Sequence, residues 1–215
     1  MSPLVGAAIA LVVGVFASIA AAENGDPNNS IKPADFLIPR EDLSTQGTDP
    51  FLFIGKVVDE NHPRWKAYRV TMDRFPTTSS CLLSEEQNKN VQNLLAFDWQ
   101  AMTSFREIEV CVFRIARNFD DVDLLRAWLV AQGFRIIDIG RRYSGEPPGK
   151  FEDEPVYRQE AFWAPDELDD KTRIYDVMPP LDRWIWFGAS QNFGLQIQLS
   201  RAYKPVGVHA SVRVN

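Results

Sequence analysis

The clearest pattern of hydrophobic and polar positions is a two-residue alternation near the carboxyl-terminal end of the chain. Successive strand residues point to opposite faces, so the alternation predicts strands with one apolar and one polar face. Lys204 and Pro205 supply a turn between the two alternating segments. We therefore expect neighbouring antiparallel strands that cover a core on one side. The alternating apolar residues are Phe193, Leu195, Ile197 and Leu199, followed by Val206, Val208, Ala210, Val212 and Val214.

The segment before them, residues 183–187, is apolar on both faces of a predicted strand. One face carries Ile185 and Phe187, and the other carries Trp184 and Trp186. If the smaller pair joins the core, the two tryptophans share the opposite face with polar side chains of the following strands. Indoles among amides, an imidazole and a guanidinium suit the binding of a sugar, a peptide or a protein partner. These polar side chains are Gln196, Gln198, His209, Ser211 and Arg213.

The first half of the chain contains three apolar runs that predict strands, at 51–58, 65–75 and 106–116. Between the second and third runs, the sequence predicts a helix that begins near Ser84. Gln87 follows Ser84 at the spacing of a capping box. Apolar residues then recur at helical spacing, which indicates a buried stripe. They are Val91, Leu94, Leu95 and Met102.

A second helix is predicted between Asp120 and Gly133. Asp120 is a suitable N-cap, and Leu125 and Leu129 form the apolar stripe. Gly133 has the position of a left-handed C-terminal cap. The apolar run at 134–139 then predicts a strand.

Two segments lack these periodic patterns. Residues 23–50 are polar and interrupted by prolines, which predicts an exposed leader rather than core. Residues 140–182 are rich in Pro, Gly and charge and predict a long loop, whose Phe162 and Trp163 could cover the two tryptophans. We therefore expect residues 51–215 to form a single α+β domain. Its mainly antiparallel sheet has two helices packed on one face and a C-terminal three-strand meander.

The amino-terminal segment, residues 1–22, predicts export. It is apolar, and no charged side chain precedes Glu23. The small residues at 20–22 suit cleavage of a signal peptide. The alternative is an uncleaved membrane anchor, because the apolar run is long enough to cross a bilayer. Both alternatives place the rest of the chain outside the cytoplasm, so we expect a periplasmic or secreted protein.

The two cysteines, Cys81 and Cys111, both lie in the part of the chain that is predicted to be exported. An even number of cysteines in an oxidising compartment favours a disulfide. The alternative is a pair of buried free thiols.

Composition and charge exclude some classes of function. The chain has 215 residues, of which 45% are hydrophobic, enough for one domain with a core. Its formal net charge is −6 and its basic residues are scattered, which argues against nucleic acid as a partner. The motifs that indicate zinc, calcium, nucleotide or dinucleotide binding are absent, so the sequence implies no metal and no cofactor.

Asp98 is the candidate catalytic residue. It falls within the apolar stripe of the first predicted helix, where burial would raise the pKa of a carboxyl group and suit it to acid–base work. The alternative is that Asp98 meets an arginine, such as Arg114, at the edge of the core.

These observations favour an exported, non-enzymatic binding or interaction protein of the cell envelope. We expect it to bind a protein partner or a glycan through the face with Trp184 and Trp186, and to contact a membrane only if residues 1–22 are not cleaved. One alternative is an exported hydrolase that uses Asp98 and an acid from 152–170. Another is a structural subunit of an envelope assembly.

Overall fold

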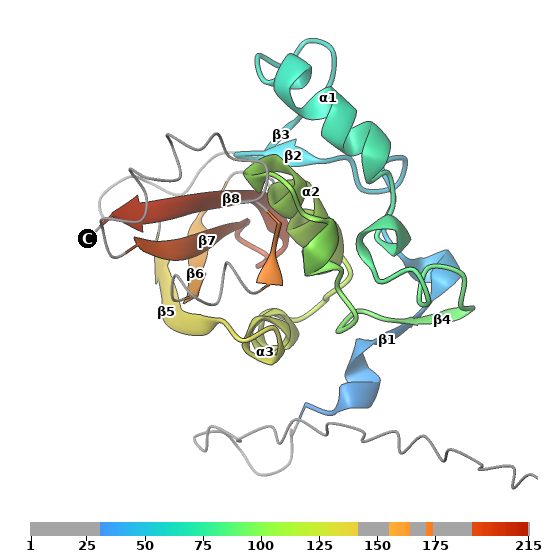
Figure 1. The fold of residues 1–215 in the computed structure, drawn as a ribbon. Helices are drawn as coiled ribbons and strands as arrows, with labels where there is room; N and C mark the ends of the chain where they lie inside the picture. The colour runs from blue at the N-terminus through green and yellow to red at the C-terminus, as the bar shows by residue number, and fades with distance from the viewer. Residues whose placement is uncertain (1–30, 142–154, 164–170, 174–190, 215) are drawn as a thin grey trace, which may run out of the picture. The chain divides into compact units, whose positions relative to one another are not determined.

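The computed structural model describes residues 31–141, 155–163, 171–173 and 191–214 (Figure 1). They belong to one compact unit, residues 31–215. The predicted signal segment lies outside the described residues. No helix in the described part of the chain is long and apolar enough to cross a membrane.

The described chain has α-helices, 3-10 helices and antiparallel sheets, so the mixed α+β class is confirmed. The α-helices are α1 (Trp65–Arg74), α2 (Phe105–Ala116) and α3 (Val122–Ala131). The 3-10 helices are η1 (Pro33–Phe36), η2 (Arg40–Asp42), η3 (Ser79–Cys81) and η4 (Trp99–Ala101). The short strands are β1 (Leu37–Pro39), β2 (Leu52–Phe53), β3 (Lys56–Val57) and β4 (Val91–Asn93). The long strands are β5 (Arg135–Arg141), β6 (Tyr157–Trp163), β7 (Gln191–Leu199) and β8 (Pro205–Val214).

The main sheet is antiparallel and has the strand order β5-β6-β7-β8. The predicted alternation at β7 and β8 is confirmed, because the two strands pair with Gln196 opposite His209. The segment 140–182, which was expected to be one long loop, instead supplies β6 between β5 and β7. The sequence of β6 does not show the alternation of apolar and polar residues that predicts a strand, because a fully buried glutamine, Gln159, occupies one of its inward positions.

Helix α2 replaces the strand that was expected at 106–116. The side chain of Ser104 accepts a hydrogen bond from the backbone of Glu107, and the two residues form a capping box. From Glu107 to Ala116 every residue of α2 is buried. A helix that is buried on all sides has no polar face, so its sequence shows an apolar run rather than a helical period.

Helix α1 replaces the second expected strand, at 65–75. The apparent alternation of Tyr68, Val70 and Met72 is misleading, because Val70 is 68% exposed while the other two are buried. Tyr68 and Met72 are four residues apart, so they lie on one face of the helix. Figure 1 shows α1 beside the β2–β3 hairpin.

The helix expected from Ser84 onward does not form. The amide of Gln87 donates to the carbonyl of Leu82 instead of completing a capping box. The chain forms turns there, and β4 then pairs with β1. Within residues 31–50, the expectation of an exposed leader is corrected in part, because Phe36 and Leu43 are buried in the core, although most of the other residues there are exposed or half-buried.

Helix α3 and its C-terminal cap are confirmed. Asp121, rather than Asp120, is the N-cap, and its side chain accepts a hydrogen bond from the backbone of Asp123. Gly133 has φ +89°, the left-handed conformation that was predicted from its position.

Replacement of Gly133 by alanine is expected to lower the free energy of unfolding by about 1 to 2 kcal/mol. The alanine would have to adopt the left-handed backbone conformation of Gly133, and its Cβ would lie 2.7 Å from Nζ of Lys171. Chemical denaturation measures the loss. Gly47→Ala is the control, because the Cβ would lie 3.7 Å from its nearest neighbour, Oγ1 of Thr45. An equal loss at both positions would contradict the account of Gly133.

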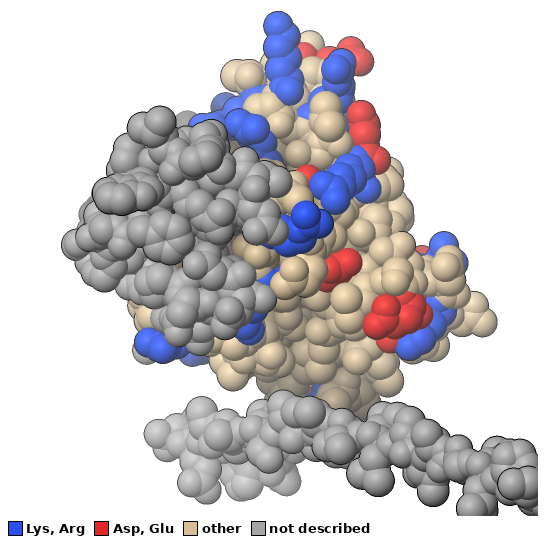
Figure 2. Space-filling view, viewed as in Figure 1, with Lys and Arg blue, Asp and Glu red and all other residues tan. Residues whose placement is uncertain are grey.

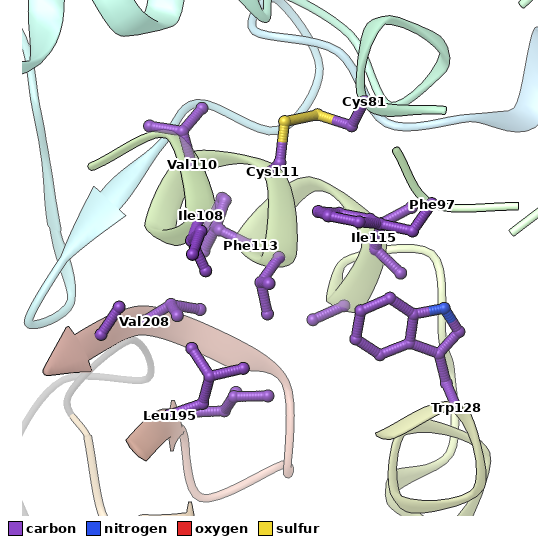
Figure 3. Close-up of a cluster of buried hydrophobic side chains, with 14 of the residues drawn as sticks. Cys81, Phe97, Ile108, Val110, Cys111, Phe113, Ile115, Trp128, Leu195 and Val208 are labelled. Carbon is purple, nitrogen blue, oxygen red and sulfur yellow. A yellow bond between two sulfur atoms is a disulfide. The ribbon is translucent and has the colours of Figure 1, made fainter. Parts of the chain in front are cut away.

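The core lies between α2 and one face of the main sheet. Figure 3 shows Ile108 and Phe113 of α2 above Leu195 and Val208 of the sheet, with Trp128 of α3 at one side. All of these side chains are buried. A disulfide joins Cys81 of η3 to Cys111 of α2 on the other side of that helix (Figure 3).

Candidate functional site

The main sheet has two distinct faces. The inner face packs against α2, and most side chains of the outer face are partly or fully exposed. The register places Gln196 directly between Glu160 and His209 on the outer face. Buried residues of the inner face are Ala161, Trp163, Phe193, Leu195, Ile197, Val208 and Ala210. Residues of the outer face are Arg158, Glu160, Phe162, Gln196, His209 and Ser211.

Trp163 therefore cannot cover the outer face as expected, because it is fully buried on the inner face. Its ring stacks on that of Phe134, with centroids 4.0 Å apart, and meets the ring of Trp99 at 4.5 Å. Phe162 is next to it in the strand and lies on the outer face. The expected pair of covering aromatics is thus divided between the two faces of β6.

A buried carboxylate, Glu109 of α2, organises the edge of the sheet at β8. One carboxylate oxygen, Oε1, accepts a hydrogen bond from the backbone N–H of Ala210 at 2.9 Å and lies 3.0 Å from Nδ1 of His209. The other oxygen, Oε2, accepts a hydrogen bond from the hydroxyl of Tyr68 in α1. We call these residues, Tyr68, Glu109, His209 and the backbone of Ala210, the Glu109 network.

The Glu109 network provides a hydrogen-bond partner for the backbone of an edge strand. Among the described strands, β8 pairs with β7 alone, so its other edge leaves backbone groups without a described strand partner. Glu109 satisfies the N–H of Ala210, and Gly55 of the β2–β3 hairpin donates to the carbonyl of Val206. The carboxylate also joins α1, α2 and the sheet through one buried group.

Burial raises the pKa of the Tyr68 hydroxyl above its ordinary value, and the charge and hydrogen bond of Glu109 add to this shift. Arg64 and Arg106 oppose it, so both guanidinium groups act on this site electrostatically. Arg64 also lies over the ring of Phe53, with Cζ 4.2 Å from the ring centroid. Two guanidinium groups therefore lie close enough to the network to act on Tyr68.

The raised pKa of Tyr68 predicts a loss of stability at alkaline pH. The ordinary pKa of the hydroxyl is 10.0, so above this pH the unfolded chain releases a proton that the folded chain keeps. The contribution of Tyr68 is therefore complete below pH 10.0 and falls above it, by at most about 1.4 kcal/mol per pH unit. Urea unfolding of the parent and Tyr68→Phe proteins from pH 8 upward measures it. Above pH 10.0, the free energy of unfolding of the parent protein should fall relative to that of Tyr68→Phe. If the two free energies change with pH in the same way, the raised pKa of Tyr68 is contradicted.

His209 is the part of the network that can meet a ligand. Its side chain is 50% exposed, whereas that of Glu109 is 5% exposed. Because Nδ1 faces the carboxylate, the other ring nitrogen, Nε2, remains for solvent or a bound group. A fixed imidazole with an orienting carboxylate can exchange a proton or form a directed hydrogen bond.

The structure brings two of the predicted binding residues together and separates a third. Gln196 and His209 are paired neighbours on the outer face. Gln198 lies on the same face but is buried. A Cβ at Gly207 would lie 2.7 Å from Oε1 of Gln198 and 3.0 Å from the backbone N of Ile54. The tip of the β2–β3 hairpin therefore covers this end of the outer face, and Gln198 does not contribute to its exposed part.

The remaining predicted binding residues lie outside what the structure describes. Residues 174–190, which include Trp184 and Trp186, are not described. Arg213 belongs to β8, where it pairs with Asn192, but its side chain is not described.

Asp98 is not inside a helix, so the expectation of a carboxylate in a buried helical stripe is wrong. It is the N-cap of η4, and its carboxylate accepts a hydrogen bond from the backbone N–H of Ala101 at 3.0 Å. The alternative contact with Arg114 is also wrong, because that guanidinium donates to the backbone carbonyl of Asp49 and to the side-chain oxygen of Gln46. Asp98 is next to Trp99, which packs on Trp163 at the inner face of the sheet. Glu160, an acid of the segment 152–170, lies on the outer face, so the sheet separates Asp98 from Glu160.

The sequence prediction missed Tyr68 and Glu109 because both fall in segments that were assigned to strands. The spacing of Ser104 and Glu107 is that of a capping box, and it would have predicted the start of α2. A helix that begins there would then have predicted that Glu109 is a charged residue surrounded by apolar ones.

No cluster of three or more His, Cys, Asp or Glu side chains in the described ranges is placed to hold a metal ion. Comparisons of the chain with protein-family models, with curated proteins and with solved structures find no match.

Proposed function

We propose that this chain is an exported, non-enzymatic binding protein of the cell envelope, and that it binds a protein partner or a glycan through the outer face of the main sheet. The observation that carries the proposal is the half-exposed imidazole of His209, which the buried carboxylate of Glu109 holds beside Gln196. Polar groups that are fixed before binding lose little entropy when they form hydrogen bonds to a ligand.

Export is part of the same proposal. The apolar segment at 1–22 has the composition of a signal peptide. The disulfide between Cys81 and Cys111 supports a periplasmic or secreted location, because disulfides persist in oxidising compartments. The mass of the mature protein from its native host tests cleavage, which should leave a chain that begins near Glu23. An intact amino terminus would favour the membrane anchor.

The proposed binding surface consists of Gln196 and His209, with Trp184, Trp186 and Arg213 as candidate additions to be tested by substitution. Gln198 is left out because it is buried. The alternative function, a hydrolase that uses Asp98, has less support because this carboxylate caps η4.

Site-specific photo-crosslinking in the native host tests the proposed surface. A photoreactive residue at position 196 should give an adduct with a protein or a glycan. The same residue at position 130 is the control, because Val130 is an exposed residue of α3. His209→Gln should reduce the adduct at position 196. Equal adducts at both positions, or none at position 196, would contradict the proposal. A hydrolytic activity that Asp98→Asn abolishes would support the alternative function instead.

A further inference from the structure

Two tyrosine rings are stacked at the end of the main sheet where the chain turns from β7 to β8. Tyr157 is the first residue of β6, and Tyr203 belongs to the turn. The ring centroids are 4.6 Å apart and the ring planes are 7° apart. The pKa of the Tyr203 hydroxyl is raised above its ordinary value, first by a hydrogen bond with Tyr157 and then by the charge of that residue. The two hydroxyls therefore lie next to each other on the same side of the stack.

The backbone holds both rings in place. The strand register pairs Tyr157 with Leu199, the last residue of β7, and the turn begins at Ser200. The backbone N–H of Tyr203 donates to the carbonyl of Ser200 at 3.0 Å, and that of Ser200 donates to the carbonyl of Lys204 at 2.8 Å. The two rings are thus brought together by the fold itself, which favours a reaction between them over a reaction between separate molecules.

The conformation of Tyr203 indicates that its side chain has a role besides the turn. Its φ is 58°, in the left-handed region, at a position where Gly is usual. A side chain there costs free energy, because its Cβ crowds the backbone. The side chain of Tyr203 is 42% exposed, so burial offsets little of this cost. Strained residues concentrate at functional sites, and the contact that Tyr203 makes is the stack with Tyr157.

No thiol of the chain competes with the tyrosine pair for an oxidant. Thiols reduce phenoxyl radicals, which are the products of one-electron oxidation of tyrosine. The chain has two cysteines, Cys81 and Cys111, and both belong to the disulfide. A radical on one ring of the pair therefore has the other ring as its immediate reaction partner.

We propose that Tyr157 and Tyr203 are a site of oxidative modification, at which hydrogen peroxide and a peroxidase join the two rings into a dityrosine cross-link. The site is separate from the outer face of the sheet. Tyr157 occupies an inner-face position of β6, two residues before the buried Gln159. The inference therefore does not rest on the proposed function.

The reaction removes one electron and one proton from each hydroxyl, and the unpaired electron of each phenoxyl radical is shared with the ring carbon Cε. A bond forms between Cε of Tyr157 and Cε of Tyr203. The hydrogen on each of these carbons then moves to the phenolic oxygen, which restores two phenols. The peroxide takes up the two electrons and the two protons and becomes two molecules of water. The new bond lies in the plane of both rings, so the ring of Tyr203 has to tilt out of the stack, and its exposure leaves room for this motion.

The charges of the protein surface do not hinder this oxidant. Lys204, which follows Tyr203 in the turn, is paired with Asp120 at 2.6 Å. Figure 2 shows lysine and arginine side chains gathered around α1, with acidic side chains among them. Hydrogen peroxide is small and uncharged, so it is neither attracted nor repelled by these groups.

The cross-link would tie the start of β6 to the turn between β7 and β8. The loop that it closes contains the whole of β7 and also the segment with Trp184 and Trp186. A closed loop restricts the unfolded chain, so the modified protein should melt at least about 5 °C above the unmodified protein.

Treatment of the purified protein with hydrogen peroxide and a haem peroxidase tests the site. The monomer should become lighter by two hydrogen atoms and gain the fluorescence of dityrosine. Trypsin separates the two tyrosines, because Arg158 and Arg201 lie between them in the sequence, so mass spectrometry should find their two peptides joined. The fraction of cross-linked monomer should not depend on protein concentration, because the rings are already in contact.

Four variants locate the link. Tyr157→Phe and Tyr203→Phe should each abolish it, because a phenyl ring forms no phenoxyl radical. Both variants keep the ring stack, so before oxidation their melting temperatures should differ from that of the parent protein by less than about 2 °C. Tyr143→Phe and Tyr175→Phe are the controls, and both should still give the link.

The absence of dityrosine, a link between other tyrosines, or a link that persists in Tyr203→Phe would overturn the inference. Cross-linked dimers in place of the modified monomer would overturn it as well. In the native host, exposure to hydrogen peroxide should produce the same joined peptides. Recovery of the protein from such cells without the link would show that the pair is not a site of modification.

Discussion

Replacement of Glu109 by alanine is expected to lower the free energy of unfolding by about 3 to 5 kcal/mol. The substitution leaves the hydroxyl of Tyr68 and the backbone N–H of Ala210 buried without an acceptor. It also leaves a cavity between α1, α2 and β8. Urea denaturation near pH 7 measures the loss.

Two further variants show how much of the lost stability is due to the charge of Glu109 and how much to any change in helix α2. Glu109→Gln keeps the shape and one acceptor oxygen, so its loss should be smaller, about 1 to 2 kcal/mol. Arg106→Ala removes an exposed charge from the same helix and should change stability by less than about 0.5 kcal/mol. A loss below about 1 kcal/mol for Glu109→Ala would show that the network does not hold the edge of the sheet.

Removal of the disulfide is expected to have a similar effect. Cys81 and Cys111 are 30 residues apart in the sequence. In the chain-entropy model, a closed loop of this length stabilises the fold by about 3 to 4 kcal/mol, because it restricts the unfolded chain. The double variant Cys81→Ala/Cys111→Ala should lose this amount in urea denaturation, and reduction of the parent protein should reproduce most of the loss.

The double variant also removes two sulfur atoms from the core, because both cysteines are fully buried, so the loss of packing has to be separated from the loss of the bond. Reduced parent protein keeps the sulfur atoms and loses only the bond, so it is the matched control. Mass spectrometry of the unreduced protein from its native host should find no free thiols. Two free thiols, or equal stability before and after reduction, would contradict a stabilising disulfide.

The elements that were predicted correctly each have a signal that is local in the sequence. The strands at the carboxyl-terminal end alternate because one face of the sheet is buried and the other is not. Helix α3 has an acidic N-cap, an apolar stripe and a terminal glycine, and Gly133 adopts the left-handed conformation that its position predicted. The approach of Cys81 and Cys111 followed from their even number in a chain predicted to be exported.

The elements that were predicted wrongly have misleading local signals. Helix α2 is buried at every residue from Glu107 to Ala116, so its sequence has no polar period and resembles a buried strand. Strand β6 carries the buried Gln159, whose amide donates to the carbonyls of Ile137 and Glu160. A polar residue whose amide N–H groups donate to backbone carbonyls inside the sheet cannot be recognised as core from its type alone.

The sequence by itself determined that the β7–β8 hairpin has one polar face, and that Gln196 and His209 belong to it. Only the tertiary structure decided which groups meet that face. Glu109 is distant from His209 in the sequence, and the two meet because α2 packs along the edge of β8. In the same way, the tip of the β2–β3 hairpin lies over Gly207, at the end of the outer face where Gln198 is buried. Periodicity records which residues of one element share a face, but contacts between elements depend on how those elements pack.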